Sequence, residues 1–107
     1  MAQVALEKLW DAFERLKTYF AQEGLKKNQS ANKLTTIISE HFDKEFIDEE
    51  FTKLTKIGNN YRIRHHETDK QELTQVHKNY FFFRMLSLID LCLVLLREEE
   101  NEEIDIF

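Results

Sequence analysis

The sequence predicts an all-α fold, and three observations support this prediction. The 107-residue chain contains no proline and only two glycines, so the residues that most often punctuate strands and tight turns are almost absent. Its apolar residues recur at steps of three and four, the period of a helix with one buried face. The composition, 42% hydrophobic and 33% charged, is that of a folded globular protein, and the length suits one domain. We therefore expect four helices packed as an antiparallel bundle.

The first helix is predicted near the amino terminus, where apolar side chains fall on one helical face. They are Leu6, Leu9, Trp10, Phe13, Leu16 and Phe20. Gly24 is placed to end this helix, because glycine readily adopts the left-handed conformation found just beyond many helices. Ser30 is then placed to cap the amino terminus of the next helix.

Two further helices are predicted from shorter patterns. The second has Leu34, Ile37, Ile38 and Phe42 at helical spacing. Its β-branched run TTII would also suit a strand, but no other segment of the sequence resembles a partner strand, so we prefer a helix. The third begins at Asp48, where acidic residues lie over the positive end of the helix dipole. Its inner face contains Phe51, Leu54 and Ile57, and it ends or bends at residues 58–60.

The last helix is predicted to be the longest, from about residue 73 to residue 99, and to be apolar on nearly all sides. Only Arg84, Ser87 and Asp90 interrupt the apolar run of residues 80–96. A surface helix needs one apolar stripe, so this helix should be central or should bury a second face against another chain. A run of 17 residues with these interruptions is short and polar for a transmembrane helix, and no membrane span is expected.

Charge is distributed unevenly along the chain. Residues 98–107 contain six of the 20 acidic residues and no basic residue, which leaves 14 acidic and 15 basic residues in residues 1–97. We therefore expect a nearly neutral bundle over residues 1–97 and an acidic tail over residues 98–107. Cys92, the single cysteine, lies in the apolar run and is expected to be buried. Without a disulfide or a recognisable signal peptide, a cytoplasmic location is predicted.

The stretch NNYRIRHHETDK, residues 59–70, concentrates the residue types that can carry chemistry. Adjacent histidines on a helix point about 100° apart, and the chain has no HExxH or ExxH sequence, so no metal and no other cofactor is expected. Arginine supplies a permanent charge for a phosphate, and histidine exchanges protons near neutral pH. Together they are the minimum set for cleaving RNA through its own 2′-hydroxyl.

Three segments, EKLWDAFERLKTYF, EEFTKLTKIGNNYRIRHHET and YFFFRMLSLIDLCL, resemble the HEPN superfamily. More narrowly, they resemble helical domains of bacterial abortive-infection and related proteins, over most of residues 4–97. The resemblance implies a HEPN-like bundle that commonly dimerises and, in many members, is a metal-independent ribonuclease. The family's site consists of an arginine, usually a polar residue after it, four to six spacers, and a histidine at the head of a long last helix.

That site can be matched to this chain in two registers. In the first, Asn59 is the polar residue, His65 is the histidine, and Gly58 stands at the arginine position. In the second, Arg62 supplies the guanidinium and His66 follows after three spacers. The resemblance thus implies a set of catalytic candidates, namely His65, Arg62, Arg64 and His66. It implies Asn59 and Arg84 as substrate contacts.

Two classes of function stay open. One is RNA recognition or cleavage in a defence or toxin-type protein, and the other is a non-catalytic module for dimerisation or partner docking. In the structural alternative, Arg62 and Arg64 pair with acidic side chains at a helix junction while Tyr61 and Ile63 anchor the core. Arg84, Ser87 and Asp90 would then form a polar seam between helices. A second copy is the expected partner, and RNA, a cognate protein or the remainder of a longer chain are further candidates.

Overall fold

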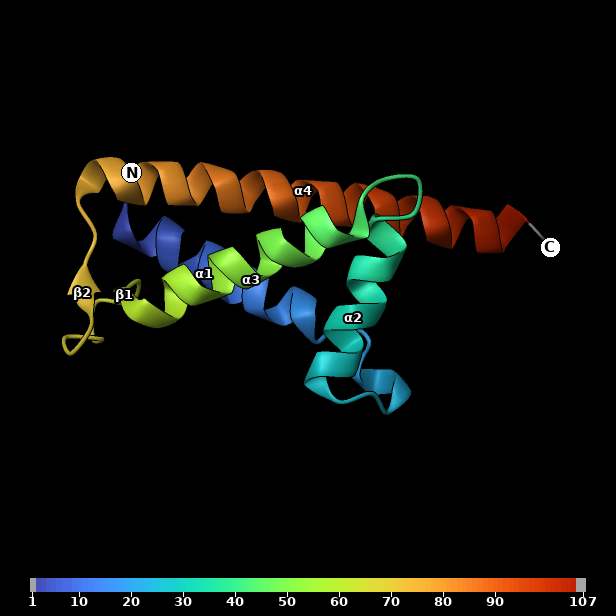
Figure 1. The fold of residues 1–107 in the computed structure, drawn as a ribbon, viewed down its shortest axis with the longest axis horizontal. Coiled ribbons are helices and arrows are strands. Elements are labelled where there is room, and N and C mark those ends of the chain that lie inside the picture. The colour runs from blue at the N-terminus through green and yellow to red at the C-terminus, as the bar shows by residue number, and fades with distance from the viewer. Residues whose placement is uncertain (1, 106–107) are drawn as a thin grey trace.

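The computed structural model describes residues 2–105, with side chains described as far as residue 101 (Figure 1). The helices are α1 (Gln3–Lys17), α2 (Lys27–Ile38), α3 (Lys44–Asn60) and α4 (Gln75–Asp105), and a short 3-10 turn, η1 (Ala21–Glu23), follows α1. The all-α prediction is confirmed. The sequence did not predict the two short strands, β1 (Tyr61–Arg62) and β2 (Gln71–Glu72), which pair in parallel between α3 and α4.

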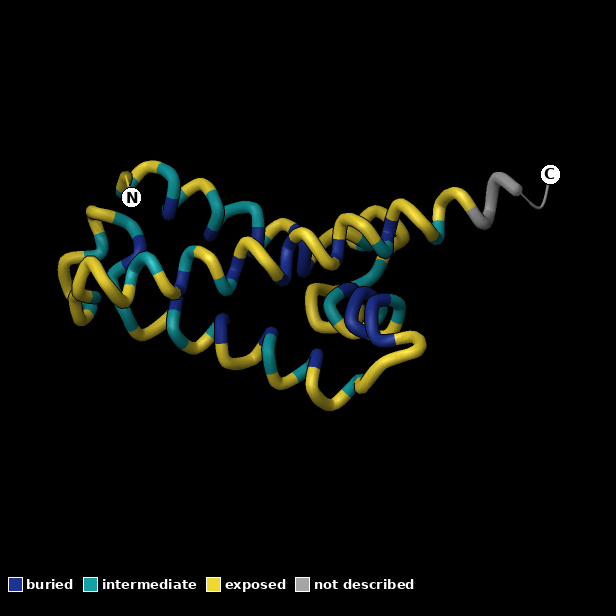
Figure 2. The backbone as a smooth tube through the Cα atoms, turned by 90° about the horizontal axis from the view of Figure 1, so that it is seen from above, coloured by how far each residue is buried: buried dark blue, intermediate teal, exposed yellow. Residues whose placement is uncertain are grey.

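The helices do not all lie side by side. α4 runs along the longest dimension of the molecule, which measures 50 Å, and α3 runs in the opposite direction to α4 (Figure 1). α1 lies beneath α4 and runs the same way, and α2 is seen almost end-on when the molecule is viewed from above (Figure 2). α2 therefore crosses the long helices, although it packs against α1, α3 and α4.

One continuous apolar core joins the four helices. The rings of Phe13 in α1 and Phe51 in α3 stack with their centroids 5.5 Å apart, and Trp10 lies 6.2 Å from Phe81 of α4. Met85 and Cys92, on the inner face of α4, are completely buried. As predicted, Cys92 is a buried hydrophobe, and burial raises the pKa of its thiol to about 12, so it stays protonated and unreactive at neutral pH.

The predicted start of the third helix is wrong by four residues. α3 begins at Lys44 because Asp43 is its N-cap, and an Asp43 carboxylate oxygen accepts a hydrogen bond from the backbone N–H of Phe46 at 3.2 Å. Asp48, the predicted start, lies inside the helix and pairs with Lys44 at 2.8 Å.

The junction between α1 and α2 also differs from the prediction. α1 ends at Lys17, and Gly24, with φ of 83°, ends the η1 turn instead. Ser30 is not the cap of α2. It lies fully buried inside that helix, and its hydroxyl oxygen accepts a hydrogen bond from the backbone N–H of Phe20 at 3.0 Å. Phe42 lies beyond the end of α2 and is 65% exposed, so it does not belong to the inner face of that helix.

The acidic segment continues the last helix. α4 extends to Asp105, so residues 98–105 of the predicted tail are helical, and residues 106–107 lie outside the described residues. The Tyr19 hydroxyl donates a hydrogen bond to a Glu100 carboxylate oxygen at 3.0 Å, which ties the beginning of this segment to the turn that follows α1.

By length and composition alone, residues Gln75–Asn101 of α4 could cross a membrane. The core helix of a soluble protein passes the same test, so this is weak support for a span. Here only 33% of the most apolar window is buried within the protein, and α4 consequently presents much apolar surface to its surroundings.

Candidate functional site

The four catalytic candidates of the sequence lie in one turn between α3 and α4, at the end of the molecule where α4 begins (Figure 1). We call residues 61–72 the basic turn. Its two ends are held together by the β1–β2 pairing, in which Tyr61 lies opposite Gln71. Ile63 is completely buried, and the side-chain amide of Gln3 donates a hydrogen bond to the Ile63 carbonyl. The prediction that Ile63 is a core anchor is confirmed, whereas Tyr61 is half-buried.

Glu67 organises the interior of the basic turn. One of its carboxylate oxygens accepts hydrogen bonds from the backbone N–H groups of Arg64 at 2.8 Å and Ile63 at 3.2 Å, and the other accepts one from Lys70 at 2.7 Å. Burial raises the pKa of Glu67, but the lysine and the two backbone donors outweigh that effect and lower it. Glu67 is therefore ionised and structural, a role that the sequence did not indicate.

Each arginine of the basic turn has an acidic partner. Arg62 forms an ion pair with Glu72 at 3.2 Å and also donates to the carbonyl oxygen of His65 at 3.1 Å. Arg64 pairs with Asp11 of α1. The structural alternative, in which both arginines pair with acidic side chains at a helix junction, is confirmed.

His65 is bound to the same face of α1. Its ring Nδ1 and its backbone N–H both lie 3.3 Å from a carboxylate oxygen of Glu7, and Glu7 and Asp11 are one helical turn apart. His66 is exposed, and its ring meets that of His65 edge-on with centroids 5.7 Å apart. The structure thus brings His65, His66, Arg62 and Arg64 together, and it adds Glu7 and Asp11, which lie more than 50 positions away in the sequence.

The partners neutralise the charge of the basic turn. Its three basic side chains, Arg62, Arg64 and Lys70, are matched by four carboxylates from Glu7, Asp11, Glu67 and Glu72. A phosphate approaching this surface would have to compete with carboxylates already bound to the guanidinium groups. Within the described residues, Arg62, Arg64 and Lys70 are therefore each paired with a carboxylate, and the two imidazoles lie exposed beside these pairs.

Gly58 is required by packing. A Cβ atom built on Gly58 would lie 1.9 Å from Cη2 of Trp10, so the indole ring occupies the space that any side chain would need. In the register that places Gly58 at the family's arginine position, the guanidinium is absent and its space is filled by Trp10. Asn59, the next residue of that register, is exposed in the last turn of α3.

Arg84 is separate from the basic turn. It lies on α4, about 14 Å along the helix from Gln75 at 1.5 Å per residue, and pairs with Glu50 of α3. The Arg84 Nε atom is 3.0 Å from a Glu50 oxygen, and this hydrogen bond from Arg84 is the main reason that the pKa of Glu50 is lowered. Ser87 and Asp90 are exposed, so the predicted polar seam is formed by Arg84 alone.

A second feature is the apolar surface of α4 that faces away from the core. We call it the α4 outer face; its exposed apolar side chains are Val76, Tyr80, Phe83, Leu86, Leu91, Leu93 and Val94. Tyr80 and Phe83 are 65% and 61% exposed, and the exposed rings of Phe42 and Phe46 lie beside them along a groove of about 450 Å³. Contiguous apolar surface of this kind usually marks an interface.

Within residues 2–101, no three histidine, cysteine or acidic side chains are grouped so that they could hold a metal ion. Searches against family models, characterised proteins and solved structures give no match for this chain. What the molecule does must therefore be inferred from its own two surface features, the basic turn and the α4 outer face.

Proposed function

We propose that this chain is a cytoplasmic helical interaction module that forms a homodimer through the α4 outer face. The observation that carries the proposal is the exposed apolar surface of α4, seen together with the charge neutralisation of the basic turn. We also propose that the fold is a HEPN-like helical bundle from a defence or toxin-type protein, although only α3 runs antiparallel to α4 while α1 runs parallel to it and α2 crosses them. The resemblance of three segments supports this, as does the placement of an Arg/His turn before a long apolar last helix.

The apolar side chains of α4 are arranged so that a second copy can match them. In an antiparallel pair of identical helices related by a two-fold axis at Ser87, residue numbers in contact sum to twice 87. Phe83 then meets Leu91 of the second copy, and Tyr80 meets Val94. The small side chain of Ser87 at the crossing point allows the two helices to approach closely. Its hydroxyl donates a hydrogen bond to the Phe83 carbonyl at 2.9 Å, so it would not be left unpaired in the interface.

Charge selects the antiparallel arrangement over the parallel one. In the antiparallel pair, Arg84 lies level with Asp90 of the second copy. In a parallel pair each residue lies level with the same residue of its partner, so like charges are level at both positions. Arg84 binds Glu50 through Nε and one terminal nitrogen, and this pairing fixes the guanidinium at the edge of the α4 outer face. Antiparallel packing also separates the two acidic segments of residues 98–105, which would repel each other if they lay side by side.

The test of this interface is a charge placed at its centre. Phe83→Asp would bury an unpaired carboxylate in the dimer, and we expect it to raise the dissociation constant at least about 100-fold. Light scattering over a range of protein concentrations should report twice the chain mass of 12.9 kDa for the wild type and the monomer mass for the variant.

Val4→Asp is the matched control, because Val4 is 59% exposed on α1 and outside the α4 outer face. It should leave the dimer intact. A wild-type monomer at every concentration would contradict the proposal, and so would wild-type protein that stays monomeric but floats with lipid vesicles, because the outer face would then be membrane-binding.

A second candidate function is metal-independent cleavage of RNA, and the exposure of His65 and His66 at one end of the molecule favours it. In that case one imidazole would take the proton of the substrate's 2′-hydroxyl as its oxygen attacks the phosphorus, and a proton would be returned to the 5′-oxygen as the P–O5′ bond breaks. Arg62 or Arg64 would stabilise the charged transition state. Asn59 would contact the substrate beside them, while Arg84 would need a second copy to bring it near.

The two candidates predict opposite results in one assay. The interaction module is expected to leave single-stranded RNA intact in EDTA, because its guanidinium groups are already neutralised. Cleavage that leaves 2′,3′-cyclic phosphate ends, and that is abolished by His65→Ala or by His66→Ala, would support the nuclease instead. The residue whose loss abolishes cleavage would also identify the register, since His65 belongs to the Asn59 register and His66 to the Arg62 register.

A further inference from the structure

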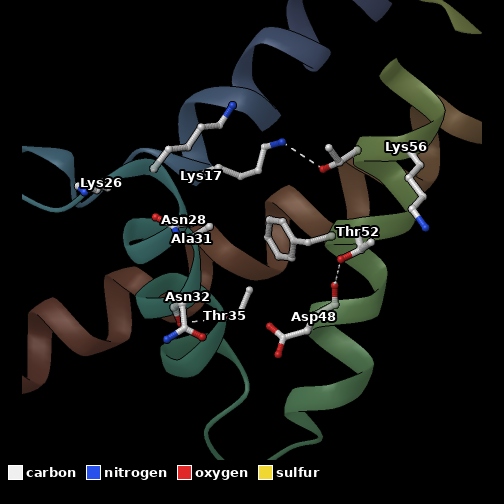
Figure 3. Close-up of a pocket in the computed structure, with 12 residues that line it drawn as sticks. Lys17, Lys26, Asn28, Ala31, Asn32, Thr35, Asp48, Thr52 and Lys56 are labelled. Atoms are coloured by element: carbon white, nitrogen blue, oxygen red, sulfur yellow. Dashed lines mark hydrogen bonds between the residues drawn. The ribbon is translucent and has the colours of Figure 1, made fainter. Parts of the chain in front are cut away.

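A pocket of about 800 Å³ lies between α2 and α3 and is separate from both features described above. It exists because α2 crosses α3 at a steep angle, so the two helices diverge and leave a wedge below the end of α1 (Figures 1 and 3). Its volume falls within the range of about 300–1,000 Å³ that is usual for small-molecule sites.

Four lysines line this pocket, which we call the lysine-rimmed pocket; Lys17 is buried and the other three are exposed. The four are Lys17, Lys26, Lys27 and Lys56. Figure 3 shows Lys26 on the α2 side and Lys56 on the α3 side, with Lys17 reaching in from α1. Among the described residues that line the pocket, Asp48 carries the only carboxylate, and it is bound to Lys44 at 2.8 Å.

The lysines are only partly compensated. Lys17 and Lys27 share one carboxylate, that of Glu14, at 2.8 and 3.2 Å. Burial raises the pKa of Glu14, but the two lysines outweigh it and lower the pKa, so Glu14 is ionised and one positive charge is left over. Lys26 and Lys56 form no ion pair within residues 2–101. The rim therefore carries a positive excess.

The floor of the pocket is apolar, and two of its threonine hydroxyls are already hydrogen-bonded within the protein. Phe51 and Ala31 both line the pocket. The hydroxyl of Thr52 donates to the Asp48 carbonyl at 2.9 Å, and that of Thr55 accepts from Lys17 at 3.1 Å. A ligand lying on this floor gains from burial of apolar surface and finds few free hydrogen-bonding groups.

We propose that the lysine-rimmed pocket binds a small amphipathic anion, of the class of a medium-chain carboxylate. Its hydrocarbon chain lies on Phe51 and Ala31, and its carboxylate is held at the lysine rim. An apolar floor attracts the chain, and the uncompensated lysines select an anionic head group over a neutral or cationic one.

Octanoate is the probe for this site, with octanol as its neutral counterpart and inorganic phosphate as the anion without a chain. In a titration followed by amide chemical shifts of ¹⁵N-labelled protein, octanoate should cause saturable changes in residues 26–35 and 48–56. Octanol and phosphate should each bind at least about tenfold more weakly, because each lacks one of the two contributions.

Lys26→Gln/Lys56→Gln is the test variant, and it should fold normally because both lysines are exposed and form no ion pair in the described structure. We expect it to weaken octanoate binding by about tenfold, the effect of removing two exposed charges. Lys53→Gln, exposed on α3 but outside the pocket lining, should bind like the wild type.

Three results would overturn the proposal. The first is shifts confined to the α4 outer face, which would place the probe on the interface. The second is octanol binding as tightly as octanoate, which would remove the role of the lysines. The third is a double variant that binds octanoate as tightly as the wild type does.

Discussion

Gly58→Ala is expected to destabilise the protein by about 2–3 kcal/mol, a large fraction of the stability of a domain this small. The added methyl group would lie 1.9 Å from Trp10 Cη2, and the indole cannot move away freely because it packs against Phe13 and Phe81. The better helix propensity of alanine offsets about 1 kcal/mol of the steric cost, which is included in this value. Thermal unfolding should show a midpoint lowered by roughly 10 °C or more.

Asn59→Ala is the control for the effect of helix propensity, since Asn59 is exposed in the same turn of α3. It should change the free energy of unfolding by no more than about 0.5 kcal/mol. In a Trp10→Leu background the clash is removed, and Gly58→Ala should then cost little. If Gly58→Ala is as mild as Asn59→Ala in the wild-type background, the close contact between α1 and α3 is not as described.

The helices could be predicted because their signal is local. Side chains such as Leu6, Trp10 and Phe13 repeat at helical spacing, and all three are buried in α1 as expected. The errors lie at the boundaries, where one hydrogen bond decides the outcome. Asp43 and Ser30 are both good capping residues, but Asp43 caps α3 while Ser30 is enclosed in α2 and bound to Phe20.

The candidate site could be predicted only in part. Its basic residues are neighbours in sequence, so their proximity was evident from the sequence. Their neutralisation was not, because Glu7 and Asp11 reach Arg64 and His65 only when α1 packs against the basic turn. Those carboxylates follow the ordinary pattern of a solvated helix face, and no periodicity distinguishes them from Lys8 or Arg15.

The lysine-rimmed pocket could not have been predicted for a similar reason. Its volume depends on the crossing angle of α2, and the apolar pattern of Leu34 and Ile38 sets which face is buried without setting that angle. The α4 outer face, in contrast, follows directly from composition. The run of residues 80–96 contains more apolar side chains than one buried stripe can use, so an exposed apolar surface was expected.

The central claim, a homodimer with its two-fold axis at Ser87, is tested most directly by Ser87→Cys. Two helices packed about 9–10 Å apart, each with its Cα atoms on a radius of about 2.3 Å, bring facing Cα atoms to about 5 Å, which is within disulfide range. The native Cys92 does not interfere, because it is buried and burial raises the pKa of its thiol to about 12.

The measurement is the fraction of covalent dimer on a non-reducing gel after mild oxidation of dilute protein. Ser87→Cys should convert almost completely to a disulfide-linked dimer, whereas the wild type should not. Lys53→Cys, exposed on α3, reports the rate of chance collisions and should react far more slowly. If Ser87→Cys forms a dimer no faster than Lys53→Cys, the two copies do not meet at Ser87 and the proposed interface is wrong.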